Sequence, residues 1–112
     1  MSDITDFTEN EMWTIGTTLK ERYGEPVPPE LADSELRLDP LSPELTLCPT
    51  AFWKHNGCHL LVCKTGETRY RCQFYYGGHE MYGTGIEEFD DLAECMVTLL
   101  QVQAEHEASK QA

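Results

Sequence analysis

The chain has 112 residues, 40% of them hydrophobic and 10% aromatic, which is enough for one folded domain and excludes an intrinsically disordered chain. Its formal net charge of −12 at pH 7 repels nucleic acid and anionic membrane surfaces, so we expect neither as a direct partner. The same charge favours a basic protein partner, although excess acidic residues also serve solubility alone.

The first predicted helix covers residues 8–24. Thr8 and Glu11 fit a capping box, in which each side chain accepts a hydrogen bond from the backbone amide of the other residue. Apolar side chains then recur at helical spacing. Gly24 is suited to the left-handed conformation that commonly ends a helix.

Residues 25–50 contain all six prolines of the chain and are predicted to form an irregular connector. Proline removes a backbone donor and discourages both helix and central strand. The regular structure expected there is a short helical turn near 29–32 and a short edge strand near 44–47. The connector is long for a structureless loop, so we expect it to pack on the body of the domain.

A four-stranded antiparallel sheet, a β-meander, is predicted for residues 51–85. Turn sequences separate its strands, and the first is the strongest short-range hairpin signal. These turns are predicted at Asn56-Gly57, Thr65-Gly66 and Gly77-Gly78. The strands are expected at about 51–55, 58–64, 67–75 and 79–84.

The last predicted element is a helix over residues 90–107, with Asp90 as its N-cap. Its apolar stripe is expected to pack on one face of the sheet. Residues 108–112 are polar and are expected to fray. The sequence therefore predicts a single α+β domain with an N-terminal helix, a proline-rich connector, a four-stranded meander and a C-terminal helix.

Two-residue turns would fix which side chains share a face of this sheet. With such turns, Leu61 lies opposite Tyr70 and Phe74 lies opposite Met81. The face predicted to pack on the helices contains Phe52, His59, Leu61, Cys63, Tyr70, Cys72, Phe74 and Met81. The outer face contains Trp53, His55, Cys58, Leu60, Val62, Arg69, Arg71, Tyr75, Glu80 and Tyr82.

The predicted outer face is a candidate interface, because protein interfaces are enriched in Trp, Tyr and Arg. Its candidate partner-binding residues are Trp53, Arg69, Arg71, Tyr75 and Tyr82. The alternative interpretation is that the connector covers this face and makes it a second core layer.

Four acidic residues, Glu87, Glu88, Asp90 and Asp91, precede the last helix. They are a candidate docking patch for a basic partner. The alternative is that they interact favourably with the helix dipole and with solvent.

Histidines and cysteines in the middle of the chain are candidates for metal binding or cysteine chemistry. Six potential ligands, His55, Cys58, His59, Cys63, Cys72 and His79, fall within a short segment. The spacing is not that of a zinc finger or ribbon, and the predicted register places them on both faces. His59 opposite Cys72 would be a nucleophile pair, but a core face does not activate a thiol. We therefore expect no enzyme activity, no metal and no cofactor.

The N-terminal residues are acidic and polar and lack the basic start and apolar run of a secretion signal. No stretch approaches the ~20 apolar residues that span a bilayer. The cysteines, five in number, are more typical of free thiols in a reducing compartment than of a disulfide framework. These features predict a cytoplasmic location.

The charge is concentrated in the two flanks: residues 1–50 carry −8, residues 51–86 carry +2 and residues 87–112 carry −6. Residues 81–92 are similar to the strand-to-helix step of HicB-like antitoxin domains, and no functional residue is transferred from that resemblance. The predicted function is binding and inhibition of a basic, nucleic-acid-handling protein, of the antitoxin, immunity or phage anti-defence type. The alternatives are a self-associating module, such as a homodimer, that uses the outer sheet face, and a small metal-binding protein.

Overall fold

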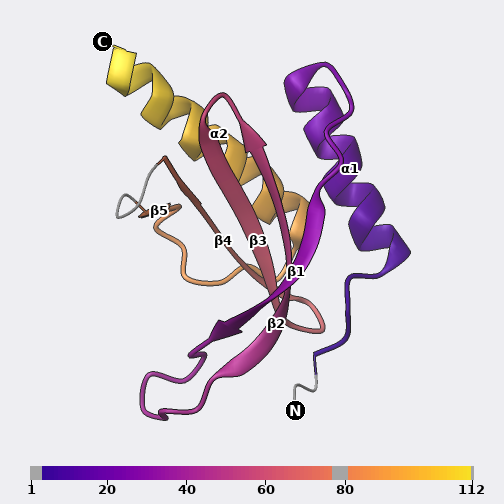
Figure 1. Cartoon of the computed structure of the whole chain (residues 1–112), viewed down its shortest axis with the longest axis vertical. Coiled ribbons are helices and arrows are strands. Elements are labelled where there is room, and N and C mark those ends of the chain that lie inside the picture. Colours follow the sequence, from indigo (N-terminus) through magenta and orange to yellow (C-terminus); the bar gives the residue numbers. More distant parts are fainter. Residues whose placement is uncertain (1–3, 77–80, 112) are drawn as a thin grey trace.

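Two helices and a five-stranded antiparallel sheet make up the fold, in a computed structural model that describes residues 4–76 and 81–111. The strands lie side by side in chain order, as a meander (Figure 1). The elements are α1 (Glu9–Tyr23), β1 (Glu30–Leu36), β2 (Thr46–His55), β3 (Cys58–Gly66), β4 (Arg69–Tyr75), β5 (Met81–Gly83) and α2 (Leu92–Gln111). The predicted α+β class is confirmed, and the sheet has one strand more than predicted.

The first helix forms as its sequence predicts. The Thr8 backbone amide donates to Glu11 Oε1 at 2.7 Å, and the Glu11 amide donates to Thr8 Oγ1 at 3.1 Å, which completes the capping box. Gly24 ends the helix with a φ of 75°. The buried side chains Ile15 and Leu19 anchor α1 against the sheet.

The connector predicted over 25–50 is only partly irregular. Strand β1 lies where a helical turn was expected near 29–32, and the edge strand expected near 44–47 overlaps the start of β2. β1 pairs along its whole length with residues 46–52 of β2. Pro49 is tolerated inside β2 because the ladder with β3 begins only at Thr50. At Pro49 the strand pairs with β1 alone, which is the kind of position where a missing backbone donor is accepted.

The first predicted turn is confirmed and the second is wrong. Asn56 and Gly57 have φ values of 50° and 79°, as a tight hairpin turn requires. The second turn lies at Glu67-Thr68 rather than at Thr65-Gly66, since β3 continues to Gly66 and the ladder shifts between Lys64 and Gly66. The predicted turn at Gly77-Gly78 lies outside the described residues.

This shift reverses the faces that were predicted for β2 and β3, and the pairing of β4 with β5 separately reverses the face predicted for β5. Leu61 pairs with Gln73 rather than with Tyr70, and Phe74 pairs with Tyr82 rather than with Met81. An odd change of register moves every side chain of a strand to the other face of the sheet relative to its neighbour. The residues buried against the helices are therefore Trp53, Cys58, Leu60 and Val62 together with Tyr70, Cys72 and Phe74.

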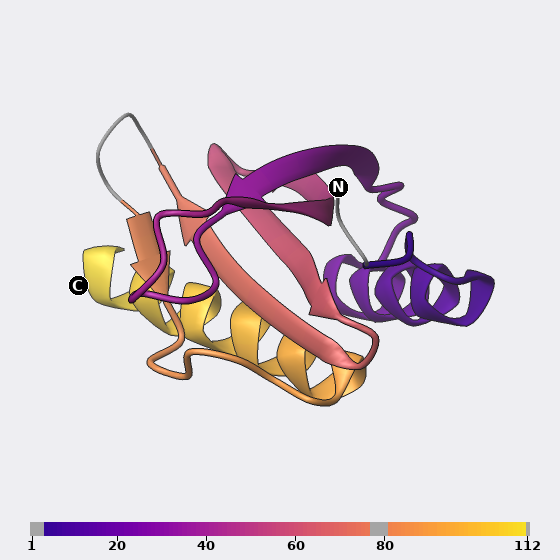
Figure 2. The ribbon, with the colours of Figure 1, turned by 90° about the horizontal axis from the view of Figure 1, so that it is seen from below.

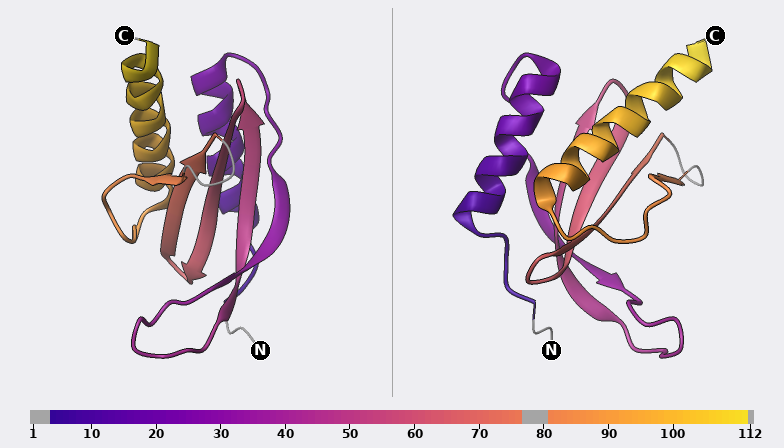
Figure 3. Two further views of the ribbon diagram at one scale, coloured as in Figure 1. Left: turned by 60° about the vertical axis from the view of Figure 1, so that its left-hand side comes forward. Right: turned by 180° about the vertical axis from the view of Figure 1, so that it is seen from behind.

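Both helices cover the same face of the sheet (Figures 2 and 3). Leu92, Cys95, Met96, Leu99 and Leu100 of α2 complete the core there. Asp91 caps α2, because its Oδ1 accepts from the amide of Ala93 at 2.9 Å. The predicted N-cap was Asp90, one residue too early. The helix also continues to Gln111, past its predicted end at 107.

A buried lysine joins the first helix to the sheet. The Lys64 side chain is 1% exposed, and its Nζ lies 2.9 Å from Glu11 Oε1. Nζ also donates to the backbone oxygen of Asp6 at 3.1 Å and to Thr5 Oγ1 at 3.2 Å. The hydroxyl of Tyr70, which pairs with Lys64 across the ladder, donates to Glu11 Oε2. The capping glutamate thus neutralises the buried ammonium.

Removal of this carboxylate is expected to destabilise the fold strongly. Glu11→Gln leaves the buried ammonium of Lys64 without a counter-charge, which should lower the free energy of unfolding by about 3 kcal/mol. Glu9→Gln is the matched control, because Glu9 lies in the same helical turn and is exposed. Lys64→Met in the Glu11→Gln background should recover part of the loss. Equal urea midpoints for Glu11→Gln and Glu9→Gln would contradict the assignment.

Acid should act through the same carboxylate. Burial raises the pKa of Glu11, but hydrogen bonds from Lys64, Tyr70 and Thr8 outweigh burial and hold the pKa below its usual value of 4.5. Ionised Glu11 therefore stabilises the fold above that pH, and the contribution is lost as the pH falls below it. In urea titrations, the decline in stability below about pH 4.5 should be shallower for Glu11→Gln than for Glu9→Gln.

Candidate protein-interaction surface

The acidic patch predicted before the last helix is largely paired with the protein's own arginines. Glu88 accepts from Thr65 Oγ1 at 2.9 Å, from Arg69 Nη1 at 3.1 Å and from Arg71 Nε at 3.4 Å. Glu87 lies 3.8 Å from Arg71 Nη2. The structure thus brings four predicted partner-binding residues together, where they bind each other.

The ionisation of Glu88 follows from this pairing. Burial raises its pKa, but the hydrogen bonds from Thr65, Arg69 and Arg71 outweigh burial and lower the pKa below its usual value. Asp91 is occupied as the cap of α2. Of the four predicted acids, only Asp90 is exposed without an ion pair or side-chain hydrogen bond to the described part of the chain.

The predicted aromatic anchors do not share a surface. Trp53 is 3% exposed on the helix-covered face, and its Nε1 donates to the hydroxyl of Tyr23 at 3.2 Å. Tyr82 also points to that face and stacks on Phe74, with ring centroids 5.4 Å apart. Only Tyr75 lies on the open face, where it stacks on His59 at 4.7 Å. Of the predicted outer-face residues, Arg69, Arg71 and Tyr75 share the open face, whereas Trp53 and Tyr82 lie on the helix-covered face.

The residues weighed for metal and cysteine chemistry are dispersed. His59 pairs with Tyr75 and Cys72 with Val62, so His59 and Cys72 point to opposite faces of the sheet. Within residues 4–76 and 81–111, no three His, Cys, Asp or Glu side chains are grouped as metal ligands. His79 lies outside those ranges. Burial raises the pKa of the Cys63 thiol, which makes the reactive thiolate scarcer.

A hairpin at the edge of the sheet carries exposed acidic residues that lie outside the sites predicted from the sequence. We call residues 30–49 the acidic arm; it consists of β1, the following loop and the start of β2. The loop and the strand ends beside it extend beyond the two helices (Figures 1 and 3). Its exposed acids are Glu30, Asp33, Glu35, Asp39 and Glu44.

These five carboxylates have no ion-pair partner among the residues that the structure describes. The arm contains a single base, Arg37, whose Nε donates to the backbone oxygen of Ser42 at 2.7 Å. That bond holds the guanidinium within the loop. The arm therefore keeps a strong negative charge.

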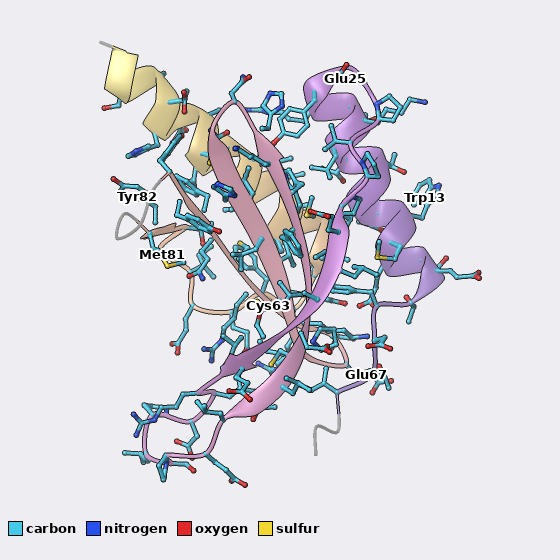
Figure 4. All side chains as sticks on the ribbon, in the orientation of Figure 1. Trp13, Glu25, Cys63, Glu67, Met81 and Tyr82 are labelled. Atoms are coloured by element: carbon cyan, nitrogen blue, oxygen red, sulfur yellow. The ribbon has the colours of Figure 1, made fainter. Side chains whose placement is uncertain are left out.

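The acidic arm also exposes large apolar side chains. Leu31, Leu41, Leu45 and Leu47 are 59%, 92%, 56% and 44% exposed, and they are half of the eight large hydrophobic residues exposed in the described part of the chain. By contrast, Trp13 is isolated on α1 and points away from the sheet, while Met81 and Tyr82 lie across the molecule on β5 (Figure 4). Exposed leucines concentrated on one hairpin are typical of an interaction surface.

Two hollows flank β1. The larger, of about 430 Å³, lies between the segment that precedes α1 and the arm; it is lined by Asp6, Phe7, Leu31, Ala32, Asp33, Pro49 and Thr50. The other, of about 210 Å³, is on the open face; it is lined by Ala32, Ser34, Thr50, Phe52, Trp53, His59, Leu60, Leu61 and Tyr75. Ala32 and Thr50 border both hollows.

No protein-family model matches the chain, and no curated protein or solved structure matches it significantly. Neither described helix is long and apolar enough to cross a membrane. The functional assignment therefore depends on the geometry and charge of the chain itself.

The pairing of the acids before α2 predicts that they act mainly on stability. Glu88→Gln removes charge-assisted bonds from a side chain that is 24% exposed, and the free energy of unfolding should fall by about 1 kcal/mol. Glu87→Gln is the control, because that side chain is 83% exposed and makes one long ion pair. Chemical denaturation should show a clearly larger loss for Glu88→Gln. Equal midpoints for the two variants would contradict this interpretation.

Proposed function

We propose that this chain acts by binding a basic protein through the acidic arm, and that it inhibits a partner whose own ligand is nucleic acid. The observation that carries the proposal is that one edge hairpin combines five exposed acids without ion-pair partners in the described chain and four exposed leucines. Neither set has a structural role in the core. Both are the side-chain types that a docking surface uses for charge complementarity and apolar contact.

Three bases of the sheet are paired with acids outside the arm. Lys64 is paired with Glu11, and Arg69 and Arg71 are paired with Glu87 and Glu88. These bases do not offset the acids of the arm. An uncompensated negative surface speeds encounter with a positive one and repels acidic proteins.

The leucines would supply affinity after encounter. Full burial of one leucine side chain contributes roughly 1.5–3 kcal/mol before the cost of association. Charge at the rim of such a contact acts mainly on the association rate, and buried apolar anchors act mainly on dissociation. The expected partner surface is therefore basic with apolar depressions.

Inhibition follows from the shared preference for basic surface. A nucleic-acid-handling protein gathers lysine and arginine where phosphates bind. When the carboxylates of the arm dock on that surface, they would occupy the phosphate-binding positions and repel the phosphates. This reasoning supports an inhibitor of the antitoxin, immunity or anti-defence type.

Self-association through the open sheet face is a weaker alternative. Of its expected anchors Trp53, Tyr75 and Tyr82, only Tyr75 lies on that face. A concentration-dependent mass in analytical ultracentrifugation would favour this alternative.

Neutralising three of the five exposed acids of the arm should strongly reduce partner capture. The test variant is Glu30→Gln, Asp33→Asn, Glu35→Gln; the matched control, Glu21→Gln, Glu25→Gln, Glu94→Gln, removes the same charge from exposed helical and cap positions. Wild type and control should retain basic proteins from a lysate of the source organism at low salt, and the arm variant should retain at least tenfold less. The purified captured protein should bind its nucleic acid more weakly in the presence of wild type.

Equal capture by both triple variants would contradict docking through the arm. A second outcome separates docking from inhibition. If the arm variant loses capture, but wild type does not weaken the partner's binding to nucleic acid, the docking surface stands and inhibition is refuted.

A further inference from the structure

The outer edge of the sheet at β1 is unpaired in the described structure. β1 has β2 as its only neighbour in the strand order of the residues described. Along Glu30–Leu36, the backbone donors and acceptors of alternate residues therefore face away from β2. The strand contains no proline or lysine, and an edge of this kind is a template for pairing with another chain.

The hollows described above lie on opposite faces of this edge. Leu31 and Asp33 border the hollow on the helix side, while Ala32 and Ser34 border the hollow on the open face. Successive side chains of a strand point to opposite faces, so a strand beside β1 would alternate its side chains between the two hollows. Strand addition uses this combination of a free backbone edge and pockets for alternate side chains.

We propose that β1 binds an extended basic segment of the partner, which joins the sheet as a sixth strand. The inference depends on the proposed function, since it specifies how the acidic arm engages its partner. The backbone edge of β1 provides hydrogen bonds, and the side chains of β1 select the sequence of the segment.

The helix-side face of β1 selects cations. Leu31 lies opposite the core residue Ala51, which places Leu31, Asp33 and Glu35 on that face in succession. Side chains directly across a ladder interact, and opposite charges stabilise the pair. The preferred segment therefore places one apolar residue and two lysines or arginines against this row.

The open face of β1 selects a large apolar side chain. Ala32 and Ser34 are small and leave the hollow of about 210 Å³ accessible from the edge. A cavity of roughly 150 Å³ is large enough for a benzene ring. An aromatic or branched aliphatic side chain between the two cations can therefore occupy this hollow.

Charge argues against a second copy of the chain as the added strand. Antiparallel pairing of two β1 strands centred on Asp33 would put Asp33 opposite Asp33 of the second copy. In-register parallel pairing would set Glu30, Asp33 and Glu35 each beside its own counterpart. Like charges directly across a ladder are destabilising, whereas a basic segment neutralises the same row.

The test uses the full chain and a synthetic nine-residue peptide that alternates lysine with valine. A peptide of the same composition, with its lysines and valines in separate blocks, controls for charge alone. Two further peptides carry methyl groups on one or the other alternating set of backbone amides. The measurements are the Kd at low salt and amide hydrogen exchange of residues 30–36 by NMR.

The alternating peptide should bind at least tenfold more tightly than the block peptide. It should slow exchange at alternate β1 amides, and methylation of one amide set alone should abolish binding. Asp33→Asn with Glu35→Gln should weaken binding at least tenfold, whereas Glu21→Gln with Glu25→Gln should change it less than twofold.

Three results would overturn strand addition: no binding of the alternating peptide, equal binding of the block peptide, or binding without slower exchange in β1. These three results leave the lysate experiment unaffected. Docking through the arm itself is refuted only if the two triple variants capture equal amounts of partner from the lysate. If the free chain at high concentration shows slow amide exchange in β1 and a dimeric mass, the strand that pairs with β1 is a second copy of the chain and not a basic segment.

Discussion

The buried ion pair between Lys64 and Glu11 connects the parts of the molecule that lie far apart in sequence. One carboxylate caps α1, neutralises the ammonium and accepts from Tyr70 on β4. The bond from Lys64 to the Asp6 carbonyl also holds the segment that precedes the helix, and Asp6 lines the larger hollow beside β1. The buried ion pair is thus joined through one backbone contact to the wall of that hollow.

Local signals in the sequence predicted the helices and the first hairpin well. The capping residues Thr8 and Glu11 and the turn at Asn56-Gly57 act over a few positions, so their structure is set by neighbours in the chain. The second hairpin could not be predicted in this way. Its register shift lies next to the buried Lys64, whose carboxylate partner is 53 positions away in the sequence.

Two features of the candidate surface could not be predicted from the sequence. The prolines of residues 25–50 indicated an irregular segment, whereas β1 and the start of β2 form an edge hairpin that tolerates Pro49. The acids near α2 were expected to be free, but tertiary folding places Arg69 and Arg71 beside Glu87 and Glu88. A net charge read from the sequence does not distinguish acids that are neutralised in the fold from acids that remain available.

The division of β2 between two surroundings has an evolutionary consequence. Its second half is in the core between β1 and β3, while its first four residues pair only with β1. The loop over 37–45 at the outer end of the hairpin has no buried residue, and substitutions at exposed sites usually alter stability by less than about 0.5 kcal/mol. The hairpin tip can therefore acquire new binding preferences while the helices and central strands keep the protein folded.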